Sequence, residues 1–120
     1  MRTTEDHLRV CRIDRGLLQR EAAALLNVKL STYQSWEQGR EPGVRFWPSI
    51  TAWLGYYPAP KPVTLAERLL AYRRLHGMTQ EELAERLGVN AGTVRRWEQG
   101  GEVRKKWIRS SLATLIGGSV

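Results

Sequence analysis

The chain has 120 residues, enough for one ordinary domain or two very small ones, and 42% of them are hydrophobic, so a folded protein with a buried core is expected. Nineteen Lys and Arg residues outnumber twelve Asp and Glu residues, and the formal charge of +7 favours polyanionic partners without identifying one. A single cysteine, Cys11, excludes an intramolecular disulfide, and no apolar segment suits a signal peptide or membrane span, so we expect a soluble, cytoplasmic protein without a membrane partner.

The sequence repeats itself with a period of 61 residues. Shifting the chain by this distance aligns identical residues without a gap. The identical pairs include Leu8 and Leu69, Arg12 and Arg73, Gly16 and Gly77, Gln19 and Gln80, Glu21 and Glu82, Ala23 and Ala84, Leu26 and Leu87, Val28 and Val89, Thr32 and Thr93, and the run Trp36, Glu37, Gln38, Gly39 with Trp97, Glu98, Gln99, Gly100. This internal duplication predicts two copies of one fold.

The first copy extends from about Glu5 to Leu54 and is expected to contain the same helices as the second. Three of its positions differ in character: Leu18 replaces Thr79, Asn27 replaces Gly88, and Lys29 replaces Asn90. Asn tolerates the left-handed conformation, so the turn at Asn27 should be retained. The copy ends in a group of aromatic residues, namely Phe46, Trp47, Trp53, Tyr56 and Tyr57. They should close the core, but their bulk exceeds what so small a unit needs, so some are candidates for contact with the second unit or a partner.

A proline-rich segment separates the copies. Residues 56–63 contain three prolines, which disfavour a helix and remove amide donors, so we expect an extended, semi-rigid linker. The predicted organisation is therefore an N-terminal domain at residues 1–55, a linker at 56–63 and a C-terminal domain at 64–120.

The second copy carries clear helix signals. Thr64 and Glu67 form a capping box ahead of a helix expected at 65–75, which Gly77 should end. The apolar positions of this helix are Leu65, Leu69, Leu70 and Leu75. Two shorter helices should follow. The first has a capping box of Thr79 and Glu82, a buried stripe of Leu83, Ala84 and Leu87, and a stop at Gly88. The second has Asn90 as its cap, Val94 and Trp97 facing inward, and a stop at Gly100.

A fourth helix is expected to close the core of this copy. Its apolar residues fall at helical spacing: Trp107, Ile108, Leu112, Leu115 and Ile116. The fold class is therefore all-α, with four or five short helices in each copy.

Residues 80–89 (QEELAERLGV) and 93–100 (TVRRWEQG) closely resemble the Cro and repressor class of helix-turn-helix regulators, often called the XRE family. The first copy matches through Gln19, Glu21, Ala23, Leu26, Val28, Thr32, Tyr33, Trp36, Glu37 and Gly39. The resemblance implies two tandem lambda-repressor-like helix-turn-helix domains that bind double-stranded DNA with sequence specificity. It further implies a nucleoid-associated transcriptional regulator, most simply a repressor.

In such a unit the second helix crosses the DNA backbone and the third lies in the major groove. The resemblance therefore places Gln80 at a phosphate, and the outward residues of the third helix near the base edges, with Arg96 the best candidate for reading a guanine. The expected DNA-binding residues of the second copy are Gln80, Asn90, Ala91, Gly92, Thr93, Arg95, Arg96, Arg104, Lys105 and Lys106. The alternative for Arg95, Arg96 and the loop cations is a merely solvated basic face.

The equivalent set in the first copy is less basic on its third helix. The expected DNA-binding residues there are Gln19, Lys29, Leu30, Ser31, Gln34, Ser35, Arg40 and Arg45. Leu30 could contact a thymine methyl and the polar side chains could hydrogen-bond to bases, while Arg40 and Arg45 lie where the family approaches phosphates or the minor groove. This surface should read DNA more weakly.

Three recurring residues have structural interpretations. The resemblance implies that Arg12 pairs with Glu37, and Arg73 with Glu98, because an arginine of the first helix and the glutamate after the third helix pair in similar domains. Trp36 and Trp97 could stack on single-stranded nucleic acid, but their spacing from Thr32 and Thr93 favours core packing.

Other functions fit the sequence less well. No catalytic constellation, metal-ligand spacing or phosphate-binding loop is recognisable, so neither an enzyme nor a cofactor or metal is expected. The main alternative is an antitoxin-like or adaptor protein that uses the helix-turn-helix fold for protein contacts. RNA is a weaker alternative, because the third helix suits the major groove of B-form DNA.

Two arrangements of the copies remain open. Both could read DNA. A unit of this size has a radius of gyration of about 10 Å and eight extended linker residues add at most about 25 Å, which together can span the roughly 34 Å between half-sites one helical turn apart. Alternatively, the second copy reads DNA while the aromatic face of the first binds a protein partner or a second copy of the chain.

Overall fold

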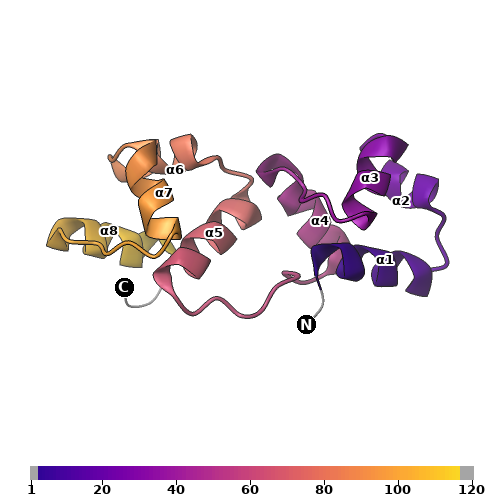
Figure 1. The fold of residues 1–120 in the computed structure, drawn as a ribbon, viewed down its shortest axis with the longest axis horizontal. Helices are drawn as coiled ribbons and strands as arrows, with labels where there is room; N and C mark the ends of the chain where they lie inside the picture. The colour runs from indigo at the N-terminus through magenta and orange to yellow at the C-terminus, as the bar shows by residue number, and fades with distance from the viewer. Residues whose placement is uncertain (1–2, 117–120) are drawn as a thin grey trace. The chain divides into compact units, whose positions relative to one another are not determined.

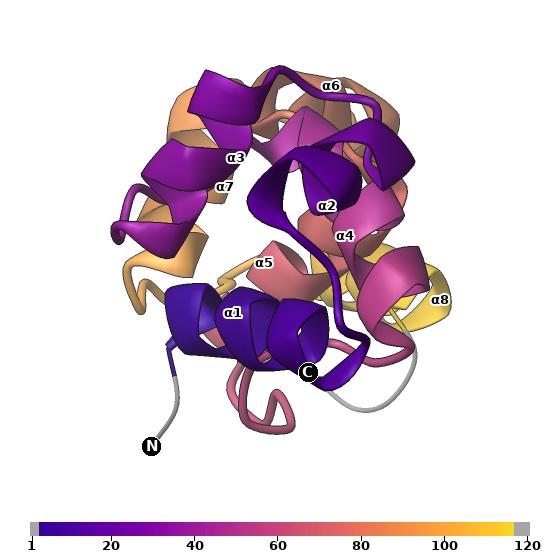
Figure 2. The ribbon, with the colours of Figure 1, turned by 90° about the vertical axis from the view of Figure 1, so that its right-hand side faces the viewer.

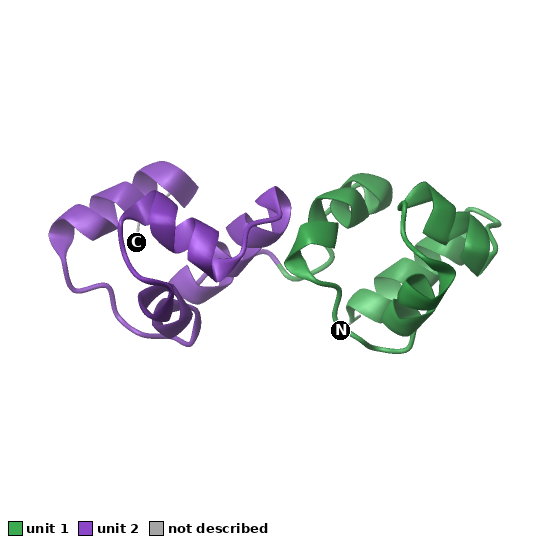
Figure 3. Cartoon of the chain, turned by 90° about the horizontal axis from the view of Figure 1, so that it is seen from above, with its two compact units in different colours: residues 1–60 green, residues 61–120 purple. Residues whose placement is uncertain are grey.

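The computed structural model describes residues 3–116, and every regular element in this range is helical. The chain divides into two compact units, residues 1–60 and 61–120 (Figure 3). This division lies inside the segment 56–63 interpreted above as a linker. Residues 1–2 of the predicted N-terminal domain and 117–120 of the predicted C-terminal domain lie outside the described residues. The all-α fold predicted from the sequence is confirmed.

Unit 1 contains four α-helices and one short 3-10 helix (Figure 1). They are α1 (Thr4–Asp14), α2 (Gln19–Leu25), α3 (Leu30–Glu37), η1 (Val44–Phe46) and α4 (Trp47–Leu54). In Figure 2, α1 lies at the bottom of unit 1 with α2 and α3 above it. Helix α3 packs against both α1 and α2.

Unit 2 repeats this plan with four α-helices. They are α5 (Leu65–His76), α6 (Gln80–Leu87), α7 (Ala91–Glu98) and α8 (Lys106–Ile116). The helix α7 packs against α5 and α6, and α8 packs against the same two helices. The third helix of each unit is therefore held by the first two.

The helix starts follow the predicted capping residues. The hydroxyl oxygens of Thr64 and Thr79 accept from the backbone N–H three residues on, at 3.1 Å each, and the matching glutamates accept from the capping residue's own N–H. Leu18 has no side-chain acceptor, but its N–H still donates to Glu21 Oε1 at 2.8 Å. The N–H of Glu21 donates to the Leu18 backbone carbonyl at 3.0 Å, so a backbone acceptor replaces the hydroxyl cap at this helix start.

The turn between the second and third helices is left-handed in both units. Gly88 has φ +73° and Asn27 has φ +58°. The prediction that Asn27 preserves this turn is confirmed, since a short polar side chain tolerates this conformation better than most L-residues. The second and third helices thus keep the same connection despite different residues.

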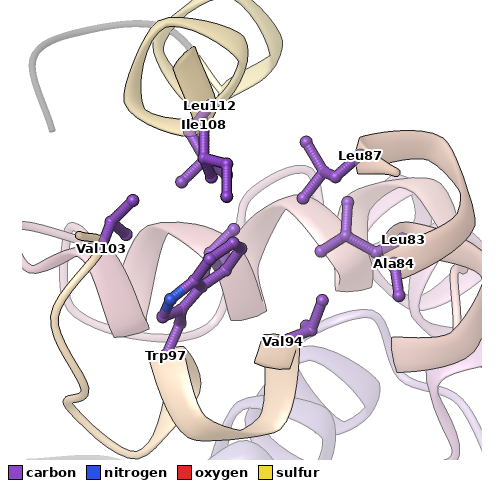
Figure 4. Close-up of a cluster of buried hydrophobic side chains, with 9 residues drawn as sticks. Leu83, Ala84, Leu87, Val94, Trp97, Val103, Ile108 and Leu112 are labelled. Atoms are coloured by element: carbon purple, nitrogen blue, oxygen red, sulfur yellow. The ribbon is translucent and has the colours of Figure 1, made fainter. Parts of the chain in front are cut away.

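Each unit has its own buried cluster. In unit 2 it consists of Leu69, Leu83, Ala84, Leu87, Val94, Trp97, Val103, Ile108 and Leu112, with Trp97 central among them (Figure 4). In unit 1 it consists of Leu8, Ala22, Ala23, Leu26, Tyr33, Trp36, Ile50 and Leu54. Cys11 is half-buried against this cluster, as expected of a small apolar residue. The predicted core positions of Trp36 and Trp97 are confirmed.

Several apolar residues expected inside lie elsewhere. Trp107 is 55% exposed and Leu75 is also exposed, because both lie at the edges of their helices' apolar stripes. Ala91, expected to face outward, packs against the unit 2 cluster. Of the aromatic group of unit 1, Trp47 is buried, whereas Phe46 and Tyr56 are exposed. The Tyr56 hydroxyl lies 2.8 Å from His7 Nδ1, so part of this bulk is used within the unit.

Candidate nucleic-acid interface

A pair of short helices joined by a tight turn forms the candidate interface in each unit. In unit 2 the turn is residues 88–90, and the N–H of Val89 donates to the Ala84 carbonyl at 3.0 Å. In unit 1 the N–H of Val28 donates to the Ala23 carbonyl at the same distance. The equal bonds hold the third helix at the same place relative to the second in both copies.

A buried ion pair fixes the far end of the third helix. Arg73 Nε lies 2.6 Å from one oxygen of Glu98, and its Nη2 donates to the other at 2.8 Å. The corresponding distances from Arg12 to Glu37 are 2.7 and 3.2 Å. Both predicted pairs are confirmed. Bidentate geometry at partly buried sites makes these arginines and glutamates architectural.

The ion pair extends to the start of the second helix. Gln80 Nε2 donates to Glu98 at 3.0 Å, and Gln19 Nε2 donates to Glu37 at 3.2 Å. Burial raises the pKa of Glu37, but hydrogen bonds from Arg12, Tyr33 and Gln19 outweigh this effect and hold the pKa below its usual value. The glutamate therefore stays ionised and ties three helices together.

The outward surface of α7 is basic. Gly92, Arg95 and Arg96 are exposed along it, as the sequence predicts. Asn90 caps the helix, because its Oδ1 accepts from the N–H of Thr93 at 2.9 Å and from the Thr93 hydroxyl at 3.0 Å. Arg95 and Arg96 are the cationic residues of this helix, and both side chains are open to solvent.

The outward surface of α3 is uncharged and partly engaged within the unit. Gln34 Nε2 donates to Gln19 Oε1 at 3.2 Å, and the Ser35 hydroxyl donates to the Thr32 carbonyl at 2.7 Å. Leu30 and Ser31 are exposed, as is Lys29 before the helix. Two of the predicted reading residues therefore have hydrogen-bond partners in the free protein.

A pocket of about 640 Å³ lies beside α7 in unit 2. The predicted residues that line it are Asn90, Thr93, Arg96, Arg104 and Lys105, together with Trp97 and Trp107. The structure thus joins the third helix and the following basic loop in one concave surface. Gln80, Ala91, Gly92, Arg95 and Lys106 are not among its lining residues.

Unit 1 has a smaller counterpart of about 480 Å³. Of its predicted residues, Ser31, Ser35 and Arg40 line this pocket, with Phe46 and the acidic Glu41. Gln19, Lys29, Leu30, Gln34 and Arg45 lie outside it. Residues 61–120 hold eleven of the nineteen Lys and Arg residues but only half of the acidic ones. Positive charge is therefore concentrated in unit 2.

Comparison with known families decides the identity of the fold. A helix-turn-helix family model matches the chain twice, over residues 8–50 and 69–106, which together make up two thirds of it. The chain belongs to the helix-turn-helix family. The two matches agree with the tandem copies predicted from the 61-residue period, and they confirm the resemblance to XRE-type regulators. Searches of curated proteins and of solved structures found no match.

As a helix-turn-helix protein, the chain is a member of a DNA-binding regulatory family. Within residues 3–116, no group of three or more His, Cys, Asp or Glu side chains is arranged to hold a metal ion. In the same range no helix is both long enough and apolar enough to cross a membrane.

Sequence reasoning missed two residues at the candidate interface. Trp107 and Phe46 line the two pockets, and they are one repeat of 61 residues apart. The sequence pattern assigns Trp107 to the apolar stripe of the last helix, and Phe46 to the aromatic group that closes the core or contacts the second unit or a partner. The alignment of the two copies could have identified these two residues. It pairs Arg45–Phe46 with Lys106–Trp107, so both copies have a basic residue followed by an aromatic one at this position.

Proposed function

We propose that this helix-turn-helix protein binds double-stranded DNA with sequence preference and represses transcription, acting in the cytoplasm at the nucleoid. The exposed pair Arg95 and Arg96 on α7 carries the proposal. These side chains project from a helix that the Arg73–Glu98 pair holds in place, and an arginine on such a helix can bind guanine O6 and N7 together. Preorganisation of the helix lowers the entropic cost of binding.

The second helix supplies the proposed phosphate contact. Gln80 uses one N–H to bind Glu98, and a side-chain amide carries two N–H groups, so the second can donate to DNA. Gln80 also stands at the first position of α6, where backbone N–H groups favour an anion. Gln19 occupies the same place in unit 1.

Two units in one chain support recognition of two unlike half-sites. The third helix of unit 2 presents two arginines, whereas that of unit 1 presents Leu30, Ser31 and polar side chains. Tethering raises the effective concentration of the second unit to roughly the millimolar range, so a weakly binding unit 1 can still add affinity. The proposed operator is therefore not palindromic.

A protein-binding role for unit 1 is the second candidate, and a difference between the copies favours it. Ile13, Leu18 and Leu25 are exposed apolar residues of unit 1. The equivalent residues of unit 2 are Arg74, Thr79 and Arg86. An adaptor or antitoxin-like protein would bind its partner through these exposed apolar residues, and a dimer formed through unit 1 would bury them between two chains.

Selection of random duplex DNA by the full-length protein tests these proposals. A recovered motif with two unlike halves about one helical turn apart supports DNA reading by both units. A single short motif assigns reading to one unit and leaves the other to a different role. If no motif emerges and all duplexes lose affinity equally as salt rises, the binding is nonspecific and the repressor proposal is wrong.

A matched pair of variants then tests the role of Arg96. Arg96→Ala should weaken binding to the selected site by about 1 to 3 kcal/mol and relax its sequence preference. Arg86→Ala removes the same charge from an exposed position on α6 and should leave the preference unchanged. Equal effects of the two substitutions in a competition titration would show that Arg96 contributes charge alone.

A further inference from the structure

Two aromatic side chains occupy the same exposed position in the two units. Trp107 is 55% exposed and Phe46 is 40% exposed. The residues that follow them, Ile108 and Trp47, are buried. Although the copies have diverged at most surface positions, both have a large ring here. One side of the Phe46 ring packs against Trp36, with 5.3 Å between the ring centroids, and the rest of the ring is open to solvent. Each ring lines the pocket beside the third helix of its unit, and an apolar ring in a concave surface is a candidate for contact with a ligand.

The surroundings of Trp107 indicate the charge of that ligand. The same pocket is lined by Arg96 from α7 and by Arg104 and Lys105 from the loop before α8. None of the lining residues described is acidic. A protein interface usually excludes charge from its apolar centre, whereas three cations around one ring suit a partner that carries negative charge beside an apolar surface.

A DNA strand has this combination. Its phosphates are anionic, and each deoxyribose between them presents an apolar C–H surface. A pocket of about 640 Å³ falls within the range of roughly 300–1,000 Å³ that holds small organic groups, so it can admit a sugar with its phosphate. The pocket also contains Arg96, the proposed base reader, so a strand in it would border the bases that α7 contacts.

We propose that Trp107 packs its indole ring against a deoxyribose of the bound DNA while Arg104 and Lys105 hold the flanking phosphates. The proposal rests on DNA binding by unit 2 and adds an apolar contact to the sugar–phosphate backbone. Because every nucleotide has this sugar, the contact adds affinity without base preference and positions Arg96 relative to the strand. Its contribution to affinity does not depend on salt, since burial of an apolar ring releases no counterions.

Fluorescence quenching by acrylamide measures the contact directly. Trp107 is exposed, whereas the other four tryptophans are buried or half-buried, so it should account for most of the quenching in the free protein. Acrylamide is uncharged and is not repelled by DNA. The probe is a mixed-sequence duplex of 30 base pairs at low salt, with its binding followed separately by the anisotropy of an attached dye. Comparison with Trp107→Phe assigns the signal to Trp107.

Binding by Trp107→Ala, Trp107→Phe and Leu75→Ala completes the test. Leu75 is an exposed apolar residue of α5 in the same unit, outside the candidate interface, so it controls for loss of surface apolar area. Burying roughly 60 Å² of ring surface predicts about tenfold weaker binding for Trp107→Ala. Trp107→Phe should retain most of the affinity, and Leu75→Ala all of it. Circular dichroism checks that each variant is folded.

The expected result is that DNA protects Trp107 from acrylamide and that Trp107→Ala weakens binding about tenfold. Binding of the duplex without protection, and with Trp107→Ala within twofold of the wild type, overturns the inference while leaving DNA binding intact. Protection that appears without DNA as protein concentration rises would identify a contact between chains and also overturn it. Failure of the wild-type chain to bind any duplex would refute the proposed function itself.

Discussion

Truncation of Glu98 to alanine should destabilise unit 2 far more than an ordinary surface substitution would. Arg73 is only 9% exposed and donates three hydrogen bonds, two to Glu98 and one to the Met78 carbonyl at 3.3 Å. The substitution removes two of these and leaves a buried guanidinium without its counter-ion. Breaking such a pair costs about 3–5 kcal/mol.

That cost is large beside the total stability of so small a unit. At roughly 0.05–0.15 kcal/mol per residue, a unit of about 60 residues is stable by only about 3–9 kcal/mol. Since 1 kcal/mol shifts the melting temperature of such a domain by about 4–8 °C, Glu98→Ala should lower the melting temperature of unit 2 by about 12 °C or more. Thermal unfolding followed by circular dichroism measures this shift.

Two controls make the measurement decisive. Glu102→Ala removes an exposed carboxylate from the same unit and should change stability by no more than about 0.5 kcal/mol. Glu98→Gln keeps an acceptor for Arg73 and should fall between the two. A loss of less than about 4 °C in Glu98→Ala would show that Arg73 is solvated in the folded state, contrary to the buried ion pair.

Three further predictions concern acid stability and DNA contacts. Because Glu37 has a lowered pKa in the folded protein, its contribution to stability is complete above the ordinary glutamate pKa of about 4.3 and is lost as the pH falls through the lower folded value. Urea titrations at pH 6 and pH 3.5 should therefore show a smaller acid-induced loss for Glu37→Gln than for the wild type, and equal losses would contradict the assignment. Gln80→Ala should weaken binding to selected and scrambled duplexes by the same factor in gel-shift titrations, because a phosphate contact carries no sequence information; a change in preference would give it a base-reading role. In a Trp107→Phe background, Phe46→Trp moves the exposed indole to unit 1, where DNA should again reduce acrylamide quenching, and an unchanged quenching constant would place unit 1 off the DNA.

The sequence predicted the scaffold well because its signals are local. The capping pairs Thr64–Glu67 and Thr79–Glu82 each lie within one helical turn, and the left-handed turn at Asn27 depends mainly on one residue's conformational range. The ion pairs join residues 25 positions apart, and no local pattern reveals them. Family resemblance supplied them, and the structure confirmed them.

The interface was harder to predict because it depends on how the loop between α7 and α8 packs against α7. Periodicity placed Trp107 with Ile108 and Leu112, but it could not define which edge of the stripe meets solvent at the start of α8. The loop also passes close to α7 at Gly101, where a Cβ would lie 2.8 Å from Arg96 Cγ and 2.9 Å from the Arg96 carbonyl oxygen. Such a close approach of the loop to α7 leaves no periodic trace in the sequence.

The duplication also changes what a single substitution can do. In a symmetric homodimer one codon specifies the same residue in both recognition helices, so a change that improves one half-site contact is imposed on the other. Here α3 and α7 are encoded separately on equivalent scaffolds, and residues such as Ser35 and Arg96 have diverged at matching positions. Each helix can therefore acquire a new preference while the ion pair beneath the other is left untouched.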